Sequence, residues 1–353
     1  MTRTHIVVVT GAGGVGKTTV SAALAIGAAA AGTRTLVVTI DPAKRLASAL
    51  GVDSLGNQPS MVPGTDGLWA AMLDITASWE AIVHRHAAPE VADRLESNPF
   101  FRAIADRFPA AQAYAAGEQM AEYSEGGAWE LVIVDTPPSA GGLDFYLAPR
   151  RMRELVGGRL LRWLTGASLP GRRALYRVTA RPMLRVADSV LGGPLLEDIA
   201  EFLLDLRTLY DGLSSRARSI ERLLGAATTL VVTTAAPASL REVRRFYSGL
   251  GEISVTPAAT IFNRDLPKEW MAPKRLPAIA GLDAEEGAIL RENLRRWGDE
   301  ARKTQDAKQE LMMRHHTDVH AIPWLEDAPT TVAELAALAE TADLTGLLQP
   351  PPR

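Results

Sequence analysis

HIVVVTGAGGVGKTT, residues 5–19, decides the fold of this 353-residue chain. The β-branched run at its start predicts a fully buried strand, and an alanine-rich helix is predicted from about Thr19 to Ala31. Between them, residues 11–18 fit the pattern G-x-x-x-x-G-K-[ST]. Because this pattern lies between a strand and a helix, as a phosphate-binding loop requires, we predict that the chain binds a nucleoside triphosphate.

The residue types of this loop suit phosphate. Its glycines let the backbone turn tightly and present successive N–H groups to phosphate oxygens, and the helix N-terminus adds its dipole. Lys17 is expected to reach the β- and γ-phosphates, and the Thr18 hydroxyl is expected to bind Mg²⁺. The predicted nucleotide contacts are Gly11, Ala12, Gly13, Gly14, Val15, Gly16, Lys17, Thr18 and Thr19.

Composition excludes several classes of protein. Hydrophobic residues make up 47% of the chain, so it can bury a large core, and a net charge of −3 does not indicate a nucleic-acid partner. With no cysteine, the chain itself offers no disulfide, cysteine–zinc site, iron–sulfur cluster or catalytic thiolate. The first predicted strand begins within five residues, and the longest apolar run, Val20 to Ala31, is too short to span a bilayer. We therefore expect a cytoplasmic protein with no integral membrane segment.

Strands and helices alternate along the chain, which predicts an α/β fold with a mostly parallel central sheet flanked by helices. Two helix-only stretches, about 77–127 and 149–225, are predicted to be insertions that form a helical subdomain. The nucleotide-binding core is then expected at about 1–76, 128–148 and 226–353, within a single domain of residues 1–353. Further strands are predicted at 34–40, 68–75, 130–134, 228–234, 256–262 and 319–322.

Two aspartates follow predicted strands. Asp135 ends the buried run Leu131-Val132-Ile133-Val134, at the sheet edge where α/β proteins place ligands, and an acid there commonly holds Mg²⁺. Asp41 follows the strand at 34–40, where it can cap a short helix that begins at Pro42. The Gly141-Gly142 pair is interpreted as part of a flexible loop that could sense the γ-phosphate.

One segment is strongly basic. Residues 150–185 contain ten arginines against one acid and are interleaved with leucines and Trp163. Such a stretch can contact anionic lipid or an apolar helix with polar flanks, or its arginines can pair with acids elsewhere. The following amphipathic stretch, 195–213, is expected to pack into the helical layer.

Five motifs resemble the ArsA-type ATPases, which include arsenite-pump ATPases and the ATPases that target tail-anchored membrane proteins. They are GAGGVGKTT at 11–19, TIDPAKRLASAL at 39–50, LVIVDTPPS at 131–139, TTAAPASLRE at 233–242 and IFNR at 261–264. The resemblance implies a dimeric ATPase of the deviant Walker A class that uses ATP and Mg²⁺.

The same resemblance assigns roles to single residues. Asp41 would orient or activate the attacking water, and Asp135 would lie by the Mg²⁺ bound to Thr18. Asn263 would hydrogen-bond the adenine, and the loop at Pro323 would contact the base. The family usually carries a second lysine, at the position of Ala12, which reaches the partner's phosphates. Its absence predicts slow hydrolysis by a homodimer, or a heterodimer with a lysine-bearing paralogue.

Several functions remain open on the sequence. The first is a switch ATPase whose opening and closing control binding of a hydrophobic client, such as a tail-anchored membrane protein, or of a membrane partner. A subunit of an arsenite-type anion pump is disfavoured, because trivalent arsenic requires thiolates. A partitioning or division-site ATPase is disfavoured because the predicted last helix, 332–347, has no Lys or Arg. A low-activity nucleotide-binding partner in a heterodimer is the fourth.

Overall fold

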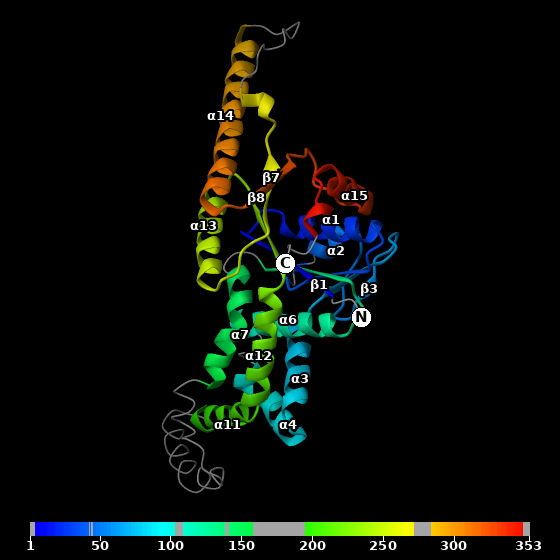
Figure 1. The fold of residues 1–353 in the computed structure, drawn as a ribbon, viewed down its shortest axis with the longest axis vertical. Helices are drawn as coiled ribbons and strands as arrows, with labels where there is room; N and C mark the ends of the chain where they lie inside the picture. Colours follow the sequence, from blue (N-terminus) through cyan, green and yellow to red (C-terminus); the bar gives the residue numbers. More distant parts are fainter. Residues whose placement is uncertain are drawn as a thin grey trace. The chain divides into compact units, whose positions relative to one another are not determined.

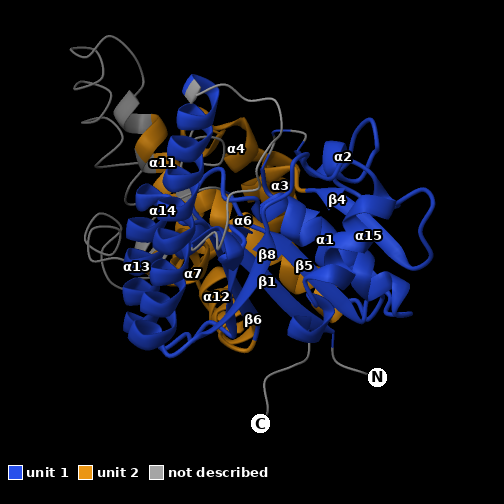
Figure 2. Ribbon diagram, turned by 90° about the horizontal axis from the view of Figure 1, so that it is seen from above, with its two compact units in different colours: residues 1–72, 126–143, 227–353 blue, residues 73–125, 144–226 orange. Residues whose placement is uncertain are grey.

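A computed structural model describes residues 4–41, 43, 45–102, 109–137, 141–157, 195–271 and 284–348. The chain divides into two compact units (Figure 2). Unit 1 comprises Met1–Met72, Gly126–Leu143 and Ala227–Arg353, and unit 2 comprises Leu73–Glu125 and Asp144–Ala226. Unit 1 contains the sheet, and the described part of unit 2 is helical.

Eight strands form one sheet in the order β3-β4-β2-β5-β1-β6-β7-β8. All neighbours pair in parallel except β3 and β4. The fold is therefore the predicted α/β type with a mostly parallel sheet. The strands are β1 (His5–Gly11), β2 (Thr35–Thr39), β3 (Ser60–Met61), β4 (Leu68–Met72), β5 (Leu131–Asp135), β6 (Thr228–Thr233), β7 (Ala259–Asp265) and β8 (Asp318–Pro323).

The register brings the carboxyl ends of the central strands together. Asp135, the last residue of β5, lies opposite Val9 of β1 and Thr39 of β2. Gly11, the last residue of β1, lies opposite Val232 of β6. Since the phosphate loop leaves β1 at this edge, the ends of β2, β5 and β6 surround its start.

Helices cover both faces of the sheet in unit 1 (Figures 1 and 2). One face carries α1 (Lys17–Ala30), α2 (Arg45–Ala49) and α15 (Val332–Thr341), and the other carries α13 (Pro237–Glu252) and α14 (Ala284–His315). The alanines of α1 pack against buried strand residues such as Val7, Val37 and Ile133. Small side chains let α1 lie close to the sheet, and each fully buried Val or Ile contributes roughly 1.5–3 kcal/mol.

Unit 2 is held together partly by buried charge. Glu118, which is 2% exposed, accepts hydrogen bonds from Arg85 and from Arg216. Arg94 pairs with the buried Asp205 at 2.8 Å. The described helices are α3 (Ile75–His86), α4 (Pro89–Ser97), α6 (Pro109–Glu125), α7 (Gly141–Gly157), α11 (Leu195–Thr208) and α12 (Tyr210–Gly225).

Several element boundaries differ from the sequence expectation. The stretch 195–213 is not one helix, because α11 ends at Thr208 and α12 begins at Tyr210. Its described apolar residues, including Phe202 and Leu206, are buried as expected of packing. Gly141-Gly142 opens α7 rather than a flexible loop, and Pro149 lies inside that helix. A Cβ at Gly142 would lie 2.1 Å from Thr10 Oγ1, so this helical turn requires glycine.

Two further predictions concern the helices. Thr331 and Glu334 form the expected capping box at the start of α15, but this helix ends at Thr341 and a 3₁₀ turn, Thr345–Leu348, follows. Among the described helices, none is long and apolar enough to cross a membrane.

Candidate functional site

The phosphate loop joins β1 to α1 through backbone conformations that need glycine. Gly14 and Gly16 have φ angles of 76° and 95°, in the left-handed region that favours glycine. A Cβ at Gly11 would lie 2.1 Å from the carbonyl oxygen of Val232, and one at Gly16 would lie 2.4 Å from Asn263 Nδ2. These glycines are therefore required by the neighbouring β6 and β7 as well as by the turn itself.

Lys17 lies within this loop. Its ammonium donates a hydrogen bond to the carbonyl oxygen of Ala12 at 2.9 Å, and the residue is 6% exposed. Burial lowers the pKa of Lys17, whereas the nearby Asp135 carboxylate acts in the opposite direction. The ammonium thus lies across the loop, whose N–H groups are the phosphate donors of such folds.

Asp135 gathers hydroxyl groups from two elements. Its carboxylate accepts hydrogen bonds from Thr18 Oγ1 at 2.8 Å and Ser21 Oγ at 3.4 Å, both on α1, and from Thr39 Oγ1 at 3.3 Å, on β2. The carboxylate is almost fully buried, and burial raises its pKa to about 6, although the three hydroxyls and Lys17 favour the ionised form. Thr18 and Asp135, predicted together as a metal site, are therefore in direct contact.

Asp41 lies beside this cluster, but its carboxylate is engaged. It accepts from the backbone N–H of Ala43 at 3.0 Å and from Arg45 at 2.9 Å. The helix after it, α2, starts at Arg45 and not at Pro42, which lies outside the described residues. Thr39 connects the two aspartates, because its hydroxyl donates to Asp135 and accepts from the N–H of Asp41 at 3.2 Å.

The end of β7 reaches over the phosphate loop. Asn263 Nδ2 donates to the carbonyl oxygen of Val15 at 2.8 Å, and Arg264 contacts the carbonyl oxygen of Gly14 at 3.4 Å. Asn263, predicted as a base contact, therefore lies against the loop. Arg264 was not singled out from the sequence, because an exposed arginine after a strand has no distinctive pattern.

Pro323 ends β8, next to β7, and borders a cavity of about 320 Å³. Leu325 and the α15 residues Ala337 and Leu338 also line it. Beside this loop, Trp324 lies 6.4 Å from Trp297 of α14, which lies 5.5 Å from Trp270, measured between ring centroids. These three rings, Trp270, Trp297 and Trp324, form a tryptophan cluster at the ends of β7 and β8.

Ala12 is enclosed: its side chain is 2% exposed and belongs to the core of unit 1. In the described part of the basic segment, Arg150, Arg151 and Arg153 pair with Glu154, Asp144 and Glu221. The rest of the segment, 158–185, lies outside the described residues.

A family model described as "Anion-transporting ATPase" matches residues 4–280. The match includes the phosphate loop, both aspartates and Asn263. The chain belongs to this family. It is accordingly an ATPase that uses nucleotide, as its ArsA-type motifs predict.

Individual relatives agree with this assignment. An uncharacterized protein of Streptomyces coelicolor is 30% identical over 94% of this chain and 74% of its own length. The ATPase GET3 of Rhodotorula glutinis is 29% identical over 52% of this chain and 48% of its own length. The ATPase ARSA1 of Chlamydomonas reinhardtii is 48% identical over 19% of this chain. The last match spans 9% of that protein, so this chain covers less than two thirds of two of these relatives.

Proposed function

We propose that the chain is a nucleotide-driven switch ATPase that holds Mg²⁺–ATP at the phosphate loop and couples its hydrolysis to binding of a hydrophobic client. The contact that carries this proposal is the 2.8 Å hydrogen bond between Thr18 and Asp135. It places a hydroxyl and a buried carboxylate one residue from Lys17. This is the arrangement that a magnesium-bound triphosphate requires.

The donor set suits Mg²⁺. The oxygens of Thr18 and Asp135 are hard ligands of the kind this ion prefers, with water and phosphate oxygens completing its shell. When bound, the ion would neutralise charge on the β- and γ-phosphates. Lys17, already inside the loop, would exchange the Ala12 carbonyl for phosphate oxygens, and the loop N–H groups would bind the remaining phosphate oxygens.

Asp41 is proposed to orient or activate the attacking water. Its carboxylate would first have to leave Arg45, because an acid in an ion pair is a weaker hydrogen-bond acceptor for water. We infer that the described geometry is a resting arrangement and that triphosphate binding releases this pair. Asn263 is proposed to contact adenine, with the Pro323 loop bordering the base.

Binding and turnover of ATP test this assignment. The Lys17→Ala change should abolish ATP binding measured by calorimetry, because it removes the cation inside the loop. Asp41→Asn should keep ATP binding and lose turnover. Asp135→Asn should lose the dependence of ATP affinity on Mg²⁺. Turnover by Asp41→Asn at the unchanged rate would refute the role given to Asp41.

We propose that the chain works as a homodimer or as a heterodimer with a lysine-bearing paralogue. Ala12 carries no charge at the position where the family's second lysine reaches the partner's phosphates. Ala12→Lys should therefore raise turnover, whereas Ala12→Met controls for the length of a side chain that must leave an enclosed position. Fast turnover of the unaltered chain, with no gain from Ala12→Lys, would contradict the proposed deficit.

The client is proposed to be hydrophobic, including a single-span membrane protein, with contacts from the helical subdomain. Purification from the native cell, with bound proteins identified by mass spectrometry, distinguishes the partners. A paralogue supports the heterodimer, and single-span membrane proteins support targeting. Recovery of an anion transporter would favour the pump instead, although the 353 residues contain no cysteine to bind trivalent arsenic.

A further inference from the structure

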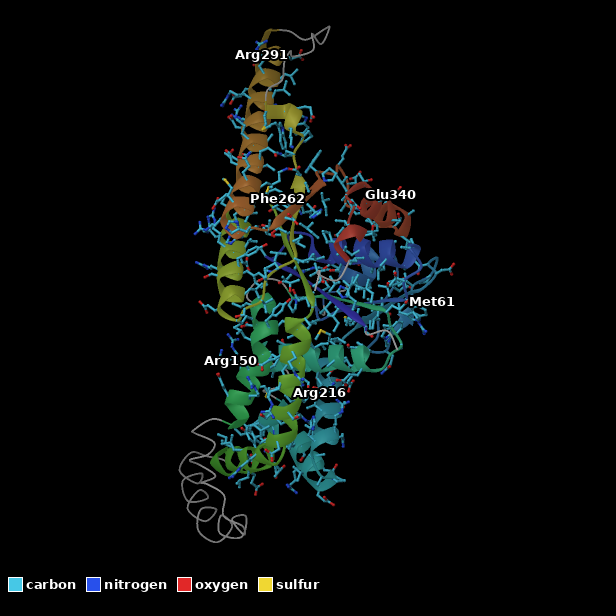
Figure 3. The ribbon with its side chains drawn as sticks, viewed as in Figure 1. Met61, Arg150, Arg216, Phe262, Arg291 and Glu340 are labelled. Carbon is cyan, nitrogen blue, oxygen red and sulfur yellow. The ribbon has the colours of Figure 1, made fainter. Side chains whose placement is uncertain are left out.

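Strand β7 ends in a β-bulge that points two side chains at the phosphate loop. Phe262 lies opposite Ala321 of β8, and Asp265 lies opposite Pro323, so three steps along β7 match two along β8. Figure 3 labels Phe262, directly before the bulge. Bulges re-aim side chains near functional sites. Here the extra residue lies in the pair Asn263-Arg264, which contacts the loop.

Arg264 has an unusual backbone. Its φ is 61°, in the left-handed region that side chains other than glycine rarely adopt. Neighbouring contacts fix this conformation: the N–H of Arg264 donates to Asn263 Oδ1 at 2.9 Å, and the next residue, Asp265, pairs with Lys308 at 2.7 Å. Strain of this kind persists where surrounding structure imposes it, and it concentrates at functional sites.

The guanidinium of Arg264 is exposed beside open space. It lies 3.4 Å from the carbonyl oxygen of Gly14, and a Cβ built at Gly14 meets no atom within 4 Å. In the parts of the chain that the structure describes, this guanidinium contacts no carboxylate, whereas Arg45 at the same site is paired with Asp41. An unmatched cation therefore stands at the apex of a loop built for phosphate.

We propose that Arg264 is a nucleotide-binding residue whose guanidinium donates to phosphate oxygens of the nucleotide held in this chain's own loop. This rests on the proposed function of the loop. A guanidinium donates through a planar fork that matches phosphate oxygens and keeps its charge at any pH. Arg264 would thus supply a second positive charge beside Lys17, in a loop where position 12 supplies none.

The test compares two substitutions at this position with a matched control. Arg264→Gln removes the charge, and Arg264→Gly also relieves the left-handed backbone, so the glycine variant should unfold at the same or a higher temperature. Arg245→Gln, at an exposed arginine of α13, makes the same charge change elsewhere. Both Arg264 variants should bind Mg²⁺–ATP about tenfold more weakly, the usual effect of losing a hydrogen bond to a charged group. The control should bind normally.

Competition assays identify the part of the nucleotide that Arg264 contacts. With a fluorescent ATP analogue as tracer, the Arg264 variants should weaken competition by inorganic tripolyphosphate and leave competition by adenosine unchanged. Unchanged ATP affinity, or a loss shared by adenosine, would overturn the assignment to phosphate. If instead neither the unaltered chain nor Lys17→Ala binds ATP, the proposed function of the loop itself fails.

Discussion

The buried carboxylate of Asp135 makes a sharp prediction about pH. Burial raises its pKa from 3.8 to about 6 in the folded chain without ligand. Between these two values the folded state keeps a proton that the unfolded state has lost, so stability falls as pH rises. Above about pH 6 both states are ionised and the loss is complete. A shift of about 2 pKa units corresponds to about 3 kcal/mol.

The perturbation is Asp135→Asn, which removes the charge and keeps the shape. Asparagine also alters the hydrogen bonds from Thr18, Ser21 and Thr39, but that cost does not change with pH. The free energy of unfolding of the variant, relative to the unaltered chain, should therefore rise by about 3 kcal/mol between about pH 4 and pH 7.

Urea unfolding of both proteins across this pH range, in the absence of nucleotide and Mg²⁺, measures the difference. Parallel pH profiles would refute the reasoning, because they would mean that Asp135 ionises normally in the folded chain. Affinity for Mg²⁺–ATP should show the opposite trend: below about pH 6 it should weaken as protonation competes with the metal.

Three further substitutions test other parts of the structure. Gly16→Ala should destabilise the chain by about 1–3 kcal/mol and abolish the thermal stabilisation given by ATP, because its methyl group would lie 2.4 Å from Asn263 Nδ2 at a left-handed φ; an unchanged melting temperature would contradict this. Glu118→Gln should cost about 3 kcal/mol in urea unfolding, since it leaves Arg85 and Arg216 without their buried carboxylate. Thr331→Ala should cost about 1 kcal/mol by removing the cap of α15, with Thr330→Ala as the matched control.

The sequence predicted the central sheet well, because its buried strands consist of β-branched residues that carry a strong local signal. Strand β3 was missed, since two exposed residues, Ser60 and Met61, have no such signal. The start of α7 was also missed. Gly141-Gly142 suggests a flexible loop on local preference, whereas the tertiary approach of Thr10 explains why glycine is needed in a helical turn.

The candidate site shows the same division. The contact between Thr18 and Asp135 was expected, because a loop motif and a strand end fix both residues near one sheet edge. The capture of Asp41 by Arg45 and the approach of Arg264 to Gly14 were not expected. Both depend on side-chain geometry, and the second also depends on a bulge that a single strand pattern does not reveal.

The tryptophan cluster gives the chain a built-in optical probe. Three of its seven tryptophans lie in this cluster, and one of them, Trp324, directly follows Pro323. Movement of that loop would change the distance from Trp324 to Trp297 and so alter the ultraviolet emission of the unlabelled protein. Stopped-flow fluorescence can therefore follow the loop in real time, and replacing Trp324 by phenylalanine provides the blank.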